Sequence, residues 1–380
     1  MNKKTVFNFS NIFPHYSKPS WLEFINSSDY KMYFGFDEFD KRGIKLVNIN
    51  DEIDPIHHNR FFKLKNIYVL KSKLIFQFGV IIRCLFTKFD VAIFLGDMKV
   101  LSTWVATLIC RFRRVEVVFA THGIYNNESK IKLFVRLLFY RLANKLLVYE
   151  NRSKRLLVKY NFSSDNIYIF FNSLNYDFQT NLYKRLLSSR VKELNFFEDN
   201  TKPIIIFIGR LTSSKKINLL INAVINLNFK YNLLIVGDGP EREKLKKLSN
   251  DYKNHIFFHG AVYDEVVLSQ LIFNSSLCVS PGNVGLTAVH SLTYGTPVIT
   301  HNNVNNQGPE SEIIEDGFNG GFFKENDIRD LTIKIDFYMS TLPKSNLIQN
   351  NCRYFIDKNY NPKNQSKILS RLIFNQKPEF

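Results

Sequence analysis

The sequence SPGNVGLTAVHSLTYGTPVIT (280–300) decides the fold class of this chain. A glycine-rich turn, Gly282–Gly285, precedes a helix-like apolar segment, Leu286–Tyr294, and a short strand pattern, Pro297–Thr300, follows. Where a strand passes through a glycine turn into a helix, backbone N–H groups converge and the helix dipole favours negative charge. The stretch therefore predicts an anion-binding turn at the edge of an α/β sheet.

A second anion-seeking segment, IIIFIGRLTSSKK (204–216), lies upstream. An apolar strand ends at Gly209 and Arg210, and Lys215 and Lys216 follow closely. The planar fork of Arg and the point charge of Lys both complement phosphate oxygens. Each turn alone is also compatible with an ordinary surface loop, but two such segments in one half of the chain predict a diphosphate ligand.

Short apolar runs alternate with helix-length amphipathic segments along the whole chain. The predicted strands are 5–9, 91–94, 116–120, 145–148 and 167–170, then 204–208, 232–236, 256–258, 277–279 and 297–300. This alternation is typical of doubly wound parallel sheets, which bind ligands beyond the carboxyl ends of their strands. Two sets of strands, joined near 178–202, predict two Rossmann-like domains, and residues 361–374 read as a C-terminal helix.

Length and composition suit two globular domains, since the chain has 380 residues and a 45% hydrophobic fraction. Its four cysteines lack CxxC spacing, which favours neither a disulfide framework nor a zinc site. The N-terminal apolar run is too short for a signal peptide, and no stretch reaches the ~18 uncharged apolar residues of a spanning helix. We therefore expect a cytoplasmic protein. The absence of a Walker motif and of an early GxGxxG disfavours an ATPase or a dehydrogenase.

Positive charge is concentrated in the first half of the chain. Residues 1–185 carry 29 Lys and Arg against 15 Asp and Glu, whereas the remainder carries 22 against 19. Two segments, Asn59–Lys88 and Lys130–Lys145, mix basic residues with Phe, Leu, Ile and Tyr. Helices of this composition can lie in the interface of an anionic membrane. The alternative is that they are core-packing helices with solvated basic faces.

The second of these segments has a helical pattern. On it, apolar side chains are expected to face inward, namely Leu133, Leu137, Tyr140 and Leu142. Basic side chains are expected to face outward, namely Lys132, Arg136 and Lys145.

Five segments of the second half resemble, in order, the donor-binding half of glycosyltransferase family 4, the retaining, nucleotide-sugar-dependent GT-B enzymes. They are GRLTSSKK (209–216), VGDGPEREKL (236–245), FFHGAV (257–262), SPGNVGLTAVHSLTYGTPVIT (280–300) and EIIEDGFNGGFF (312–323). The first half is similar to the family less densely, through FPHYSKPSW (13–21), THGIYNNESK (121–130) and FFNSLNYD (170–177).

The resemblance implies a GT-B fold of two Rossmann-like doubly wound parallel-sheet domains facing a cleft. Residues 1–180 would form the acceptor-binding domain and residues 200–360 the nucleotide-sugar-binding domain. The C-terminal helix at 361–380 would pack back on the first domain.

One departure from the family lies in its E-x7-E pair, whose positions here are Gly282 and His290. The resemblance implies that the first Glu contacts the donor sugar and the second contacts the ribose. Asn283 and Glu310 are therefore candidates to reach the sugar, and His290 could bond the ribose hydroxyls as a neutral imidazole. The predicted donor-binding residues are Gly209, Arg210, Lys215, Gly237, Asn283, Gly285, Leu286, Thr287, His290 and Glu310.

Catalysis is expected to depend on Arg210, Lys215 and His122. The two cations would stabilise the charge that builds on the leaving diphosphate, in place of a metal ion. His122 ends a predicted strand and would hydrogen-bond the transferred sugar or orient the acceptor, because the resemblance implies a front-face mechanism in which the leaving phosphate takes the acceptor proton. The predicted acceptor-binding residues are His15, Tyr16, Lys18, Asp97 and Glu128.

These features predict a metal-independent glycosyltransferase that moves a sugar with retention from a nucleotide sugar to a lipid-linked glycan, in bacterial surface polysaccharide biosynthesis such as that of O antigen or capsule. No cofactor and no metal are expected. The expected partners are the nucleotide sugar, a glycan or polyprenyl-diphosphate-linked acceptor and the anionic inner face of the cell membrane, but not nucleic acid. Two alternatives stay open: a nucleotide-sugar epimerase of the same fold, and a catalytically silent nucleotide-sugar-binding protein.

Overall fold

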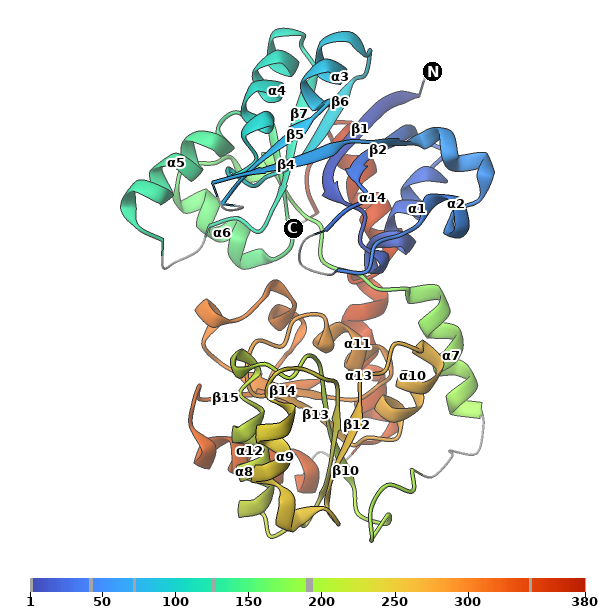
Figure 1. Cartoon of the computed structure of the whole chain (residues 1–380), viewed down its shortest axis with the longest axis vertical. Helices are drawn as coiled ribbons and strands as arrows, with labels where there is room; N and C mark the ends of the chain where they lie inside the picture. The colour runs from blue at the N-terminus through green and yellow to red at the C-terminus, as the bar shows by residue number, and fades with distance from the viewer. Residues whose placement is uncertain are drawn as a thin grey trace. The chain divides into compact units, whose positions relative to one another are not determined.

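The computed structural model describes residues 3–40, 44–70, 73–124, 128–188, 194–341 and 344–379. The chain divides into two compact units, each built on its own parallel sheet (Figure 1). Unit 1 comprises Met1–Leu174 and Pro362–Phe380, and unit 2 comprises Asn175–Asn361. The last helix of the chain therefore belongs to the same unit as the N-terminal half.

Unit 1 contains a seven-stranded parallel sheet in the order β3-β2-β1-β6-β7-β8-β9. Its strands are β1 (Lys4–Ile12), β2 (Tyr30–Asp37), β3 (Phe61–Lys63), β6 (Val91–Leu95), β7 (Glu116–Thr121), β8 (Lys145–Val148) and β9 (Ile167–Ile169). A separate antiparallel hairpin pairs β4 (Lys65–Val69) with β5 (Leu74–Phe78). The order reverses direction between β1 and β6, so the ends of these two strands mark the topological switch point of the sheet.

Helices cover both faces of this sheet, and the central strands β6 and β7 are accordingly buried and mostly apolar. Right-handed crossovers place α3 (Val80–Phe86), α4 (Leu101–Phe112), α5 (Lys130–Tyr140) and α6 (Asn151–Lys159) on one face. The other face carries α1 (Lys18–Ile25), and α14 (Pro362–Ile373) packs beside it. A hydrogen bond of 2.6 Å from Ser20 Oγ to Gln365 Oε1 joins these last two helices inside the unit.

Unit 2 contains a six-stranded parallel sheet in the order β12-β11-β10-β13-β14-β15. Its strands are β10 (Ile204–Ile208), β11 (Asn232–Val236), β12 (Ile256–Gly260), β13 (Leu277–Ser280), β14 (Val298–His301) and β15 (Gly320–Phe323). Here the order reverses between β10 and β13. The core packs the apolar strands against α8 (Ile217–Asn226) and α12 (Ile328–Thr341) on one face. The remaining helices of the unit are α7 (Tyr176–Ser188), α9 (Arg242–Leu248), α10 (Glu265–Phe273), α11 (Thr287–Thr293) and α13 (Asn346–Lys358).

The predicted fold class, two doubly wound parallel-sheet domains, is confirmed. The predicted strands at 145–148, 204–208 and 232–236 have the bounds expected from the sequence, and the others overlap their predictions. Strands β2, β3 and β15 were not predicted. β15 reads GGFF, and glycine weakens the strand signal of such a segment. The segment joining the two sheets contains α7, which was also not foreseen.

Two expectations for the basic–aromatic segments are wrong. Asn59–Lys88 was expected to be helical, but most of it forms β3 and the β4–β5 hairpin, with only α3 as a helix. The alternation of exposed and buried residues in β4 explains the strand. Arg136 and Lys145 were expected to face outward, yet both are buried. Arg136 bonds Glu128, and Lys145 lies 2.6 Å from Glu116 Oε1, so internal carboxylates hold both cations inside.

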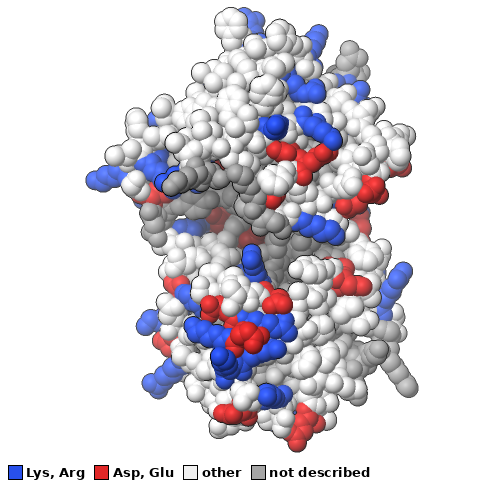
Figure 2. Space-filling view, in the orientation of Figure 1, with Lys and Arg blue, Asp and Glu red and all other residues white. Residues whose placement is uncertain are grey.

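Among the described residues, no helix is both long and apolar enough to cross a membrane. Charged side chains of both signs appear on the visible surface of each unit (Figure 2).

Candidate functional site

The carboxyl ends of β10 and β13 flank the switch point of the unit 2 sheet. Gly209 and Arg210 follow β10, and the turn Pro281–Gly285 follows β13 before α11 begins. The two anion-seeking segments of the sequence are therefore brought side by side. In open α/β sheets this is the place where ligands bind.

Lys215 lies beside the switch point between β10 and β13. It ends the short 3-10 helix η4 (Ser213–Lys215), and its Nζ donates to the carbonyl oxygen of Asn283 in the turn after β13. Burial lowers the pKa of the Lys215 ammonium, and the nearby Glu310 carboxylate opposes this effect. A partly desolvated ammonium beside a glycine turn is well placed to bind an anion, because water screens it less than it would at the surface.

The adjacent Lys216 plays a different part. It adopts a left-handed backbone with φ of +51°, and its Nζ lies 2.6 Å from Glu325 Oε1, just beyond β15. Asn303 and Asn306 also donate to Glu325, and these contacts hold the loop after β14 in place. The predicted site residue is Lys215 and not Lys216, and in the structure Lys215 lies against the glycine turn whereas Lys216 forms an internal ion pair.

The turn after β13 lies so close to η4 that only glycine fits at its second position. A Cβ on Gly282 would lie 2.1 Å from the carbonyl oxygen of Ser214 and 2.7 Å from the Cα of Lys215. Gly237, after β11, is constrained in the same way, since a Cβ there would lie 1.9 Å from the carbonyl oxygen of Gly209. These close backbone contacts form the floor of the candidate site and leave no room for a glutamate side chain at position 282.

The rest of the turn is held by side chains from neighbouring elements. Gly285 has a φ of +55°, and Thr287 Oγ1 donates to the carbonyl oxygen of Ile208 at 3.1 Å. The backbone N–H of Val284 donates to Gln307 Oε1 at 2.9 Å. Sequence reasoning missed Gln307, because its role depends on a loop fold that no motif announces.

His290 lies on α11, and its Nε2 is 2.7 Å from Glu265 Oε1. The same oxygen accepts from the Tyr294 hydroxyl at 2.5 Å and from Gln179 Nε2 at 3.0 Å. Burial alone would raise the pKa of the Glu265 carboxyl, but the bonds from His290, Tyr294 and Gln179 outweigh it and hold this pKa below its ordinary value. Glu265 was not among the predicted site residues, and nothing in its local sequence distinguishes it from an ordinary first residue of a helix.

Glu310 lies in the short 3-10 helix η7 (Pro309–Ile313) and is buried. A Cβ on Gly308 would lie 2.8 Å from Glu310 Oε2 and 3.6 Å from the side-chain amide of Asn283. Glu310 also affects the pKa of Lys215. The structure therefore gathers Asn283, Glu310 and Lys215, three of the predicted donor-binding residues, around one spot.

In unit 1, His122 follows β7, and Asp97 follows β6 in the neighbouring position of the sheet. Part of the His122 ring is exposed, but the protein around it lowers its pKa by desolvation, which Asp97 partly opposes. The ring lies 4.9 Å from that of Tyr149, and its backbone carbonyl accepts from Ser153 Oγ. The lowered pKa favours the neutral form of the imidazole, which is suited to hydrogen bonding rather than to carrying charge.

The loop after β1 brings His15, Tyr16 and Lys18 to the same carboxyl edge of the unit 1 sheet. His15 Nε2 and Lys18 Nζ each lie 3.2 Å from Glu52 Oε2, while the Tyr16 side chain is exposed. Glu52 was not predicted, and it fixes the two basic side chains of this loop.

Glu128 has a different environment from the one expected of an acceptor-binding residue. Its carboxylate is buried, receives two hydrogen bonds from Arg136 and lies 3.0 Å from Lys132 Nζ. These contacts tie Glu128, which lies just before α5, to two side chains of that helix.

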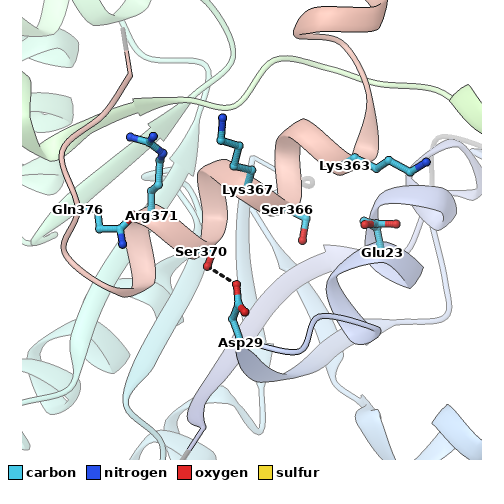
Figure 3. Close-up of a pocket in the computed structure, with 8 residues that line it drawn as sticks. All are labelled: Glu23, Asp29, Lys363, Ser366, Lys367, Ser370, Arg371 and Gln376. Carbon is cyan, nitrogen blue, oxygen red and sulfur yellow. Dashed lines mark hydrogen bonds between the residues drawn. The ribbon is translucent and has the colours of Figure 1, made fainter. Parts of the chain in front are cut away.

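A polar cavity of about 380 Å³ lies elsewhere in unit 1, along α14 (Figure 3). It is lined by Glu23, Asp29, Lys363, Ser366, Lys367, Ser370, Arg371 and Gln376. None of these is a predicted site residue, and the side chains carry both signs of charge, so the cavity does not mark the candidate site. Within the described residues, no group of three or more His, Cys, Asp or Glu side chains could hold a metal ion.

Substitution of Gly282 tests the close packing of the turn against η4. We expect Gly282→Ala to cost about 1–3 kcal/mol of unfolding free energy, because its Cβ must push the Ser214 backbone away. Gly282→Glu should be at least as harmful. Thermal or urea unfolding measures this, with Asn283→Ala as the neighbouring control, which should cost less. A Gly282→Glu variant as stable as the wild type would refute the packing argument.

Glu265 should make the stability of unit 2 depend on pH. Because its folded pKa is below the ordinary carboxyl value, its contribution is present above that value and lost as the pH falls through the folded pKa. Glu265→Gln should lose about 1–3 kcal/mol at neutral pH. The difference from wild type, measured by urea unfolding, should shrink in acid, whereas the exposed Glu243→Gln should differ little from wild type at any pH. A loss that is the same at neutral and acid pH would contradict this prediction.

Residues 192–376 match the family model of the glycosyl transferases group 1. An uncharacterised glycosyltransferase of Methanocaldococcus jannaschii is 26% identical over 278 residues, which cover 68% of each chain.

Two solved structures share the fold over nearly the whole chain. The complex of Anabaena HepE with UDP has a TM-score of 0.68 and 16% identity, and covers 98% of this chain and 99% of its own. The lipopolysaccharide outer core galactosyltransferase WaaB has a TM-score of 0.65 and 16% identity, with the same coverage. The segment with the glycine turns, Arg210 and Lys215 is thus similar to the glycosyl transferases group 1.

Proposed function

We propose that this protein is a glycosyltransferase that takes a sugar from a nucleotide-sugar donor bound by unit 2. The observation that carries the proposal is the pairing of Lys215 with the glycine turn after β13, beside Arg210 at the switch point of the sheet. Two cations and a row of backbone N–H groups at this place suit a diphosphate. The UDP complex of Anabaena HepE, which shares the fold, supports a nucleoside diphosphate as the ligand.

The chemistry follows from where charge develops. When the bond between the sugar and the diphosphate breaks, negative charge builds on the leaving phosphate, and Arg210 and Lys215 would stabilise it without a metal ion. Lys215 is well suited to this because its desolvated ammonium gains more from a new negative charge than an exposed one would. Retention of configuration would follow if the leaving phosphate takes the acceptor proton on the same face of the sugar.

The two missing glutamates are replaced, in this proposal, by groups on other elements. Asn283 and the buried Glu310 would contact the donor sugar, since they lie together beside Lys215. His290 would bond the ribose hydroxyls, with Glu265 holding its ring. Glu265 is then a positioning residue. Because its carboxylate can only accept a hydrogen bond, it keeps a proton on Nε2 of the His290 imidazole.

Unit 1 would bind the acceptor at the carboxyl edge of its sheet, where His15, Tyr16, Lys18, Asp97 and His122 lie. We propose a lipid-linked glycan, in the synthesis of a bacterial surface polysaccharide at the anionic inner face of the membrane. The basic character of the first half supports this acceptor class, because a polyprenyl diphosphate is itself anionic.

A catalytically silent nucleotide-sugar-binding protein is the second candidate. The replacement of both E-x7-E glutamates by Gly282 and His290 favours it. It differs from the enzyme in a single measurable respect, since it would bind the donor without transferring or hydrolysing the sugar.

Neighbouring lysines provide a matched test of the diphosphate site. Calorimetry with UDP and GDP should show that Lys215→Met lowers the affinity at least tenfold, because it removes the cation that faces the turn. Arg210→Ala should do the same. Lys216→Met, which removes an equal charge one residue away, should cost stability but little affinity. Equal losses for the two lysine variants would contradict the assignment, and the absence of binding by the wild type would refute the donor site.

Transfer itself is tested with a panel of nucleotide sugars and an anionic lipid extract as acceptor source. We expect radiolabelled sugar to enter the lipid fraction at a rate unchanged by EDTA, and NMR of the product to show the anomeric configuration of the donor. Donor binding without transfer or hydrolysis would favour the silent binder, and loss of activity in EDTA would overturn metal independence. Conversion of the donor when no acceptor is present would instead indicate an epimerase.

A further inference from the structure

Three consecutive helices of unit 1 turn apolar side chains outward. On α4 the exposed residues are Leu101, Val105, Leu108 and Phe112, and on α5 they are Ile131, Phe134, Val135 and Leu138. On α3 they are Ile82, Leu85 and Phe86. The spacings of three and four residues place each set on one side of its helix. Phe112 is 92% exposed, Phe86 81% and Phe134 66%, which is far from the burial these side chains prefer.

These three helices lie next to one another. Cys84 of α3 contacts Cys110 of α4, and Arg113 donates to the carbonyl oxygens at the end of α3. Trp104 of α4 packs on Phe139 of α5 with ring centroids 4.7 Å apart. Since all three helices cover the same face of the sheet, their outward residues form one surface, which we call the apolar face.

Cations surround the apolar face. Residues 80–145 contain eleven Lys and Arg against four Asp and Glu. Glu116 and Glu128 are paired with Lys145 and Arg136, and Glu128 also lies 3.0 Å from Lys132, so outside these two pairs the segment keeps nine cations against two acids. Exposed basic side chains, namely Lys88, Arg111, Arg114, Lys130 and Lys132, lie at the ends of the three helices. In Figure 2 the surface over these helices is largely white, with blue at its margins.

We propose that the apolar face binds the surface of an anionic lipid bilayer. Its aromatic and aliphatic side chains would enter the acyl boundary while the surrounding cations bind lipid phosphates, as amphipathic helices do at an interface. Charge complementarity selects this partner, because a second copy of the chain would bring equal positive charge to the same margin. The proposal deepens the proposed function, since it names the part of unit 1 that would meet a lipid-linked acceptor.

Other features of the fold agree with binding at the membrane surface rather than with a membrane-spanning helix. In the described residues no helix could cross a membrane, and α3, α4 and α5 have 7, 12 and 11 residues. Unit 2 has exposed apolar residues too, such as Ile333 and Phe337 on α12, but its sequence is close to neutral. The exposed apolar residues of α12, which lack a basic surrounding sequence, therefore provide an internal control for the role of charge.

Vesicle co-sedimentation of the full chain tests the proposal without any donor or acceptor. The wild type should bind vesicles of phosphatidylglycerol mixed with phosphatidylcholine, and bind phosphatidylcholine alone at least tenfold more weakly. The double variants Leu108→Asp with Phe112→Asp, and Ile131→Asp with Phe134→Asp, should each lower the partition coefficient at least tenfold. Lys88→Gln with Lys130→Gln should weaken binding mainly at low salt, whereas Ile333→Asp with Phe337→Asp on unit 2 should leave it unchanged.

Thermal unfolding of each variant checks that unit 1 still folds, which is expected because the substituted side chains are exposed. Absence of wild-type binding to anionic vesicles would overturn the proposal, as would full binding by both aspartate variants. A dimeric wild type that becomes monomeric in these variants, without a change in vesicle binding, would assign the face to a second copy instead. The assay needs no nucleotide. Vesicle binding can therefore be absent while unit 2 still binds nucleotide, and nucleotide binding can be absent while vesicle binding is present.

Discussion

The contact between the Gly282 backbone and the Ser214–Lys215 backbone is the constraint on which the candidate site depends. It brings the turn after β13 against the segment after β10, across the point where the strand order of unit 2 reverses. Only because no Cβ intervenes can Lys215 reach the carbonyl oxygen of Asn283 and stay largely out of water. A bulkier residue at 282 would separate the two segments, and the cation would then be an ordinary surface lysine.

The same close contact gives a packing reason for a glycine, rather than a glutamate, at position 282. A glutamate at position 282 would need space that the Ser214 carbonyl occupies, so the turn and the missing carboxylate are two aspects of one packing arrangement. Acidic groups near the site instead come from elsewhere, with Glu310 from η7 and Glu265 from the start of α10. In the enzyme we propose, the carboxylates have changed position along the chain while the glycine turn and the two cations remain.

Much of the fold could be predicted because parallel strands buried on both faces leave an unmistakable apolar run. IIIFI (204–208) and NLLIV (232–236) are examples. β15 was missed because its glycines weaken that signal, and the β4–β5 hairpin because its mixed basic and aromatic residues also suit a surface helix. For the site, Arg210, Lys215 and the glycine turn were predictable from local chemistry. Glu265, Gln307 and Glu52 were not, because their roles arise from contacts with residues distant in sequence.

Arg136 shows why charge patterns mislead when read along the chain. On α5 a basic residue every few positions predicts a solvated face, but Glu128 lies just before the helix and draws Arg136 inward. The guanidinium also donates to Tyr140 at 3.1 Å, so it bonds two partners beneath the helix. With Arg136 turned inward, the apolar residues Phe134, Val135 and Leu138 are left on the outer side. The ion pair and the buried Phe139 and Tyr140 thus lie on the inner side of α5, and the apolar stripe lies on its outer side.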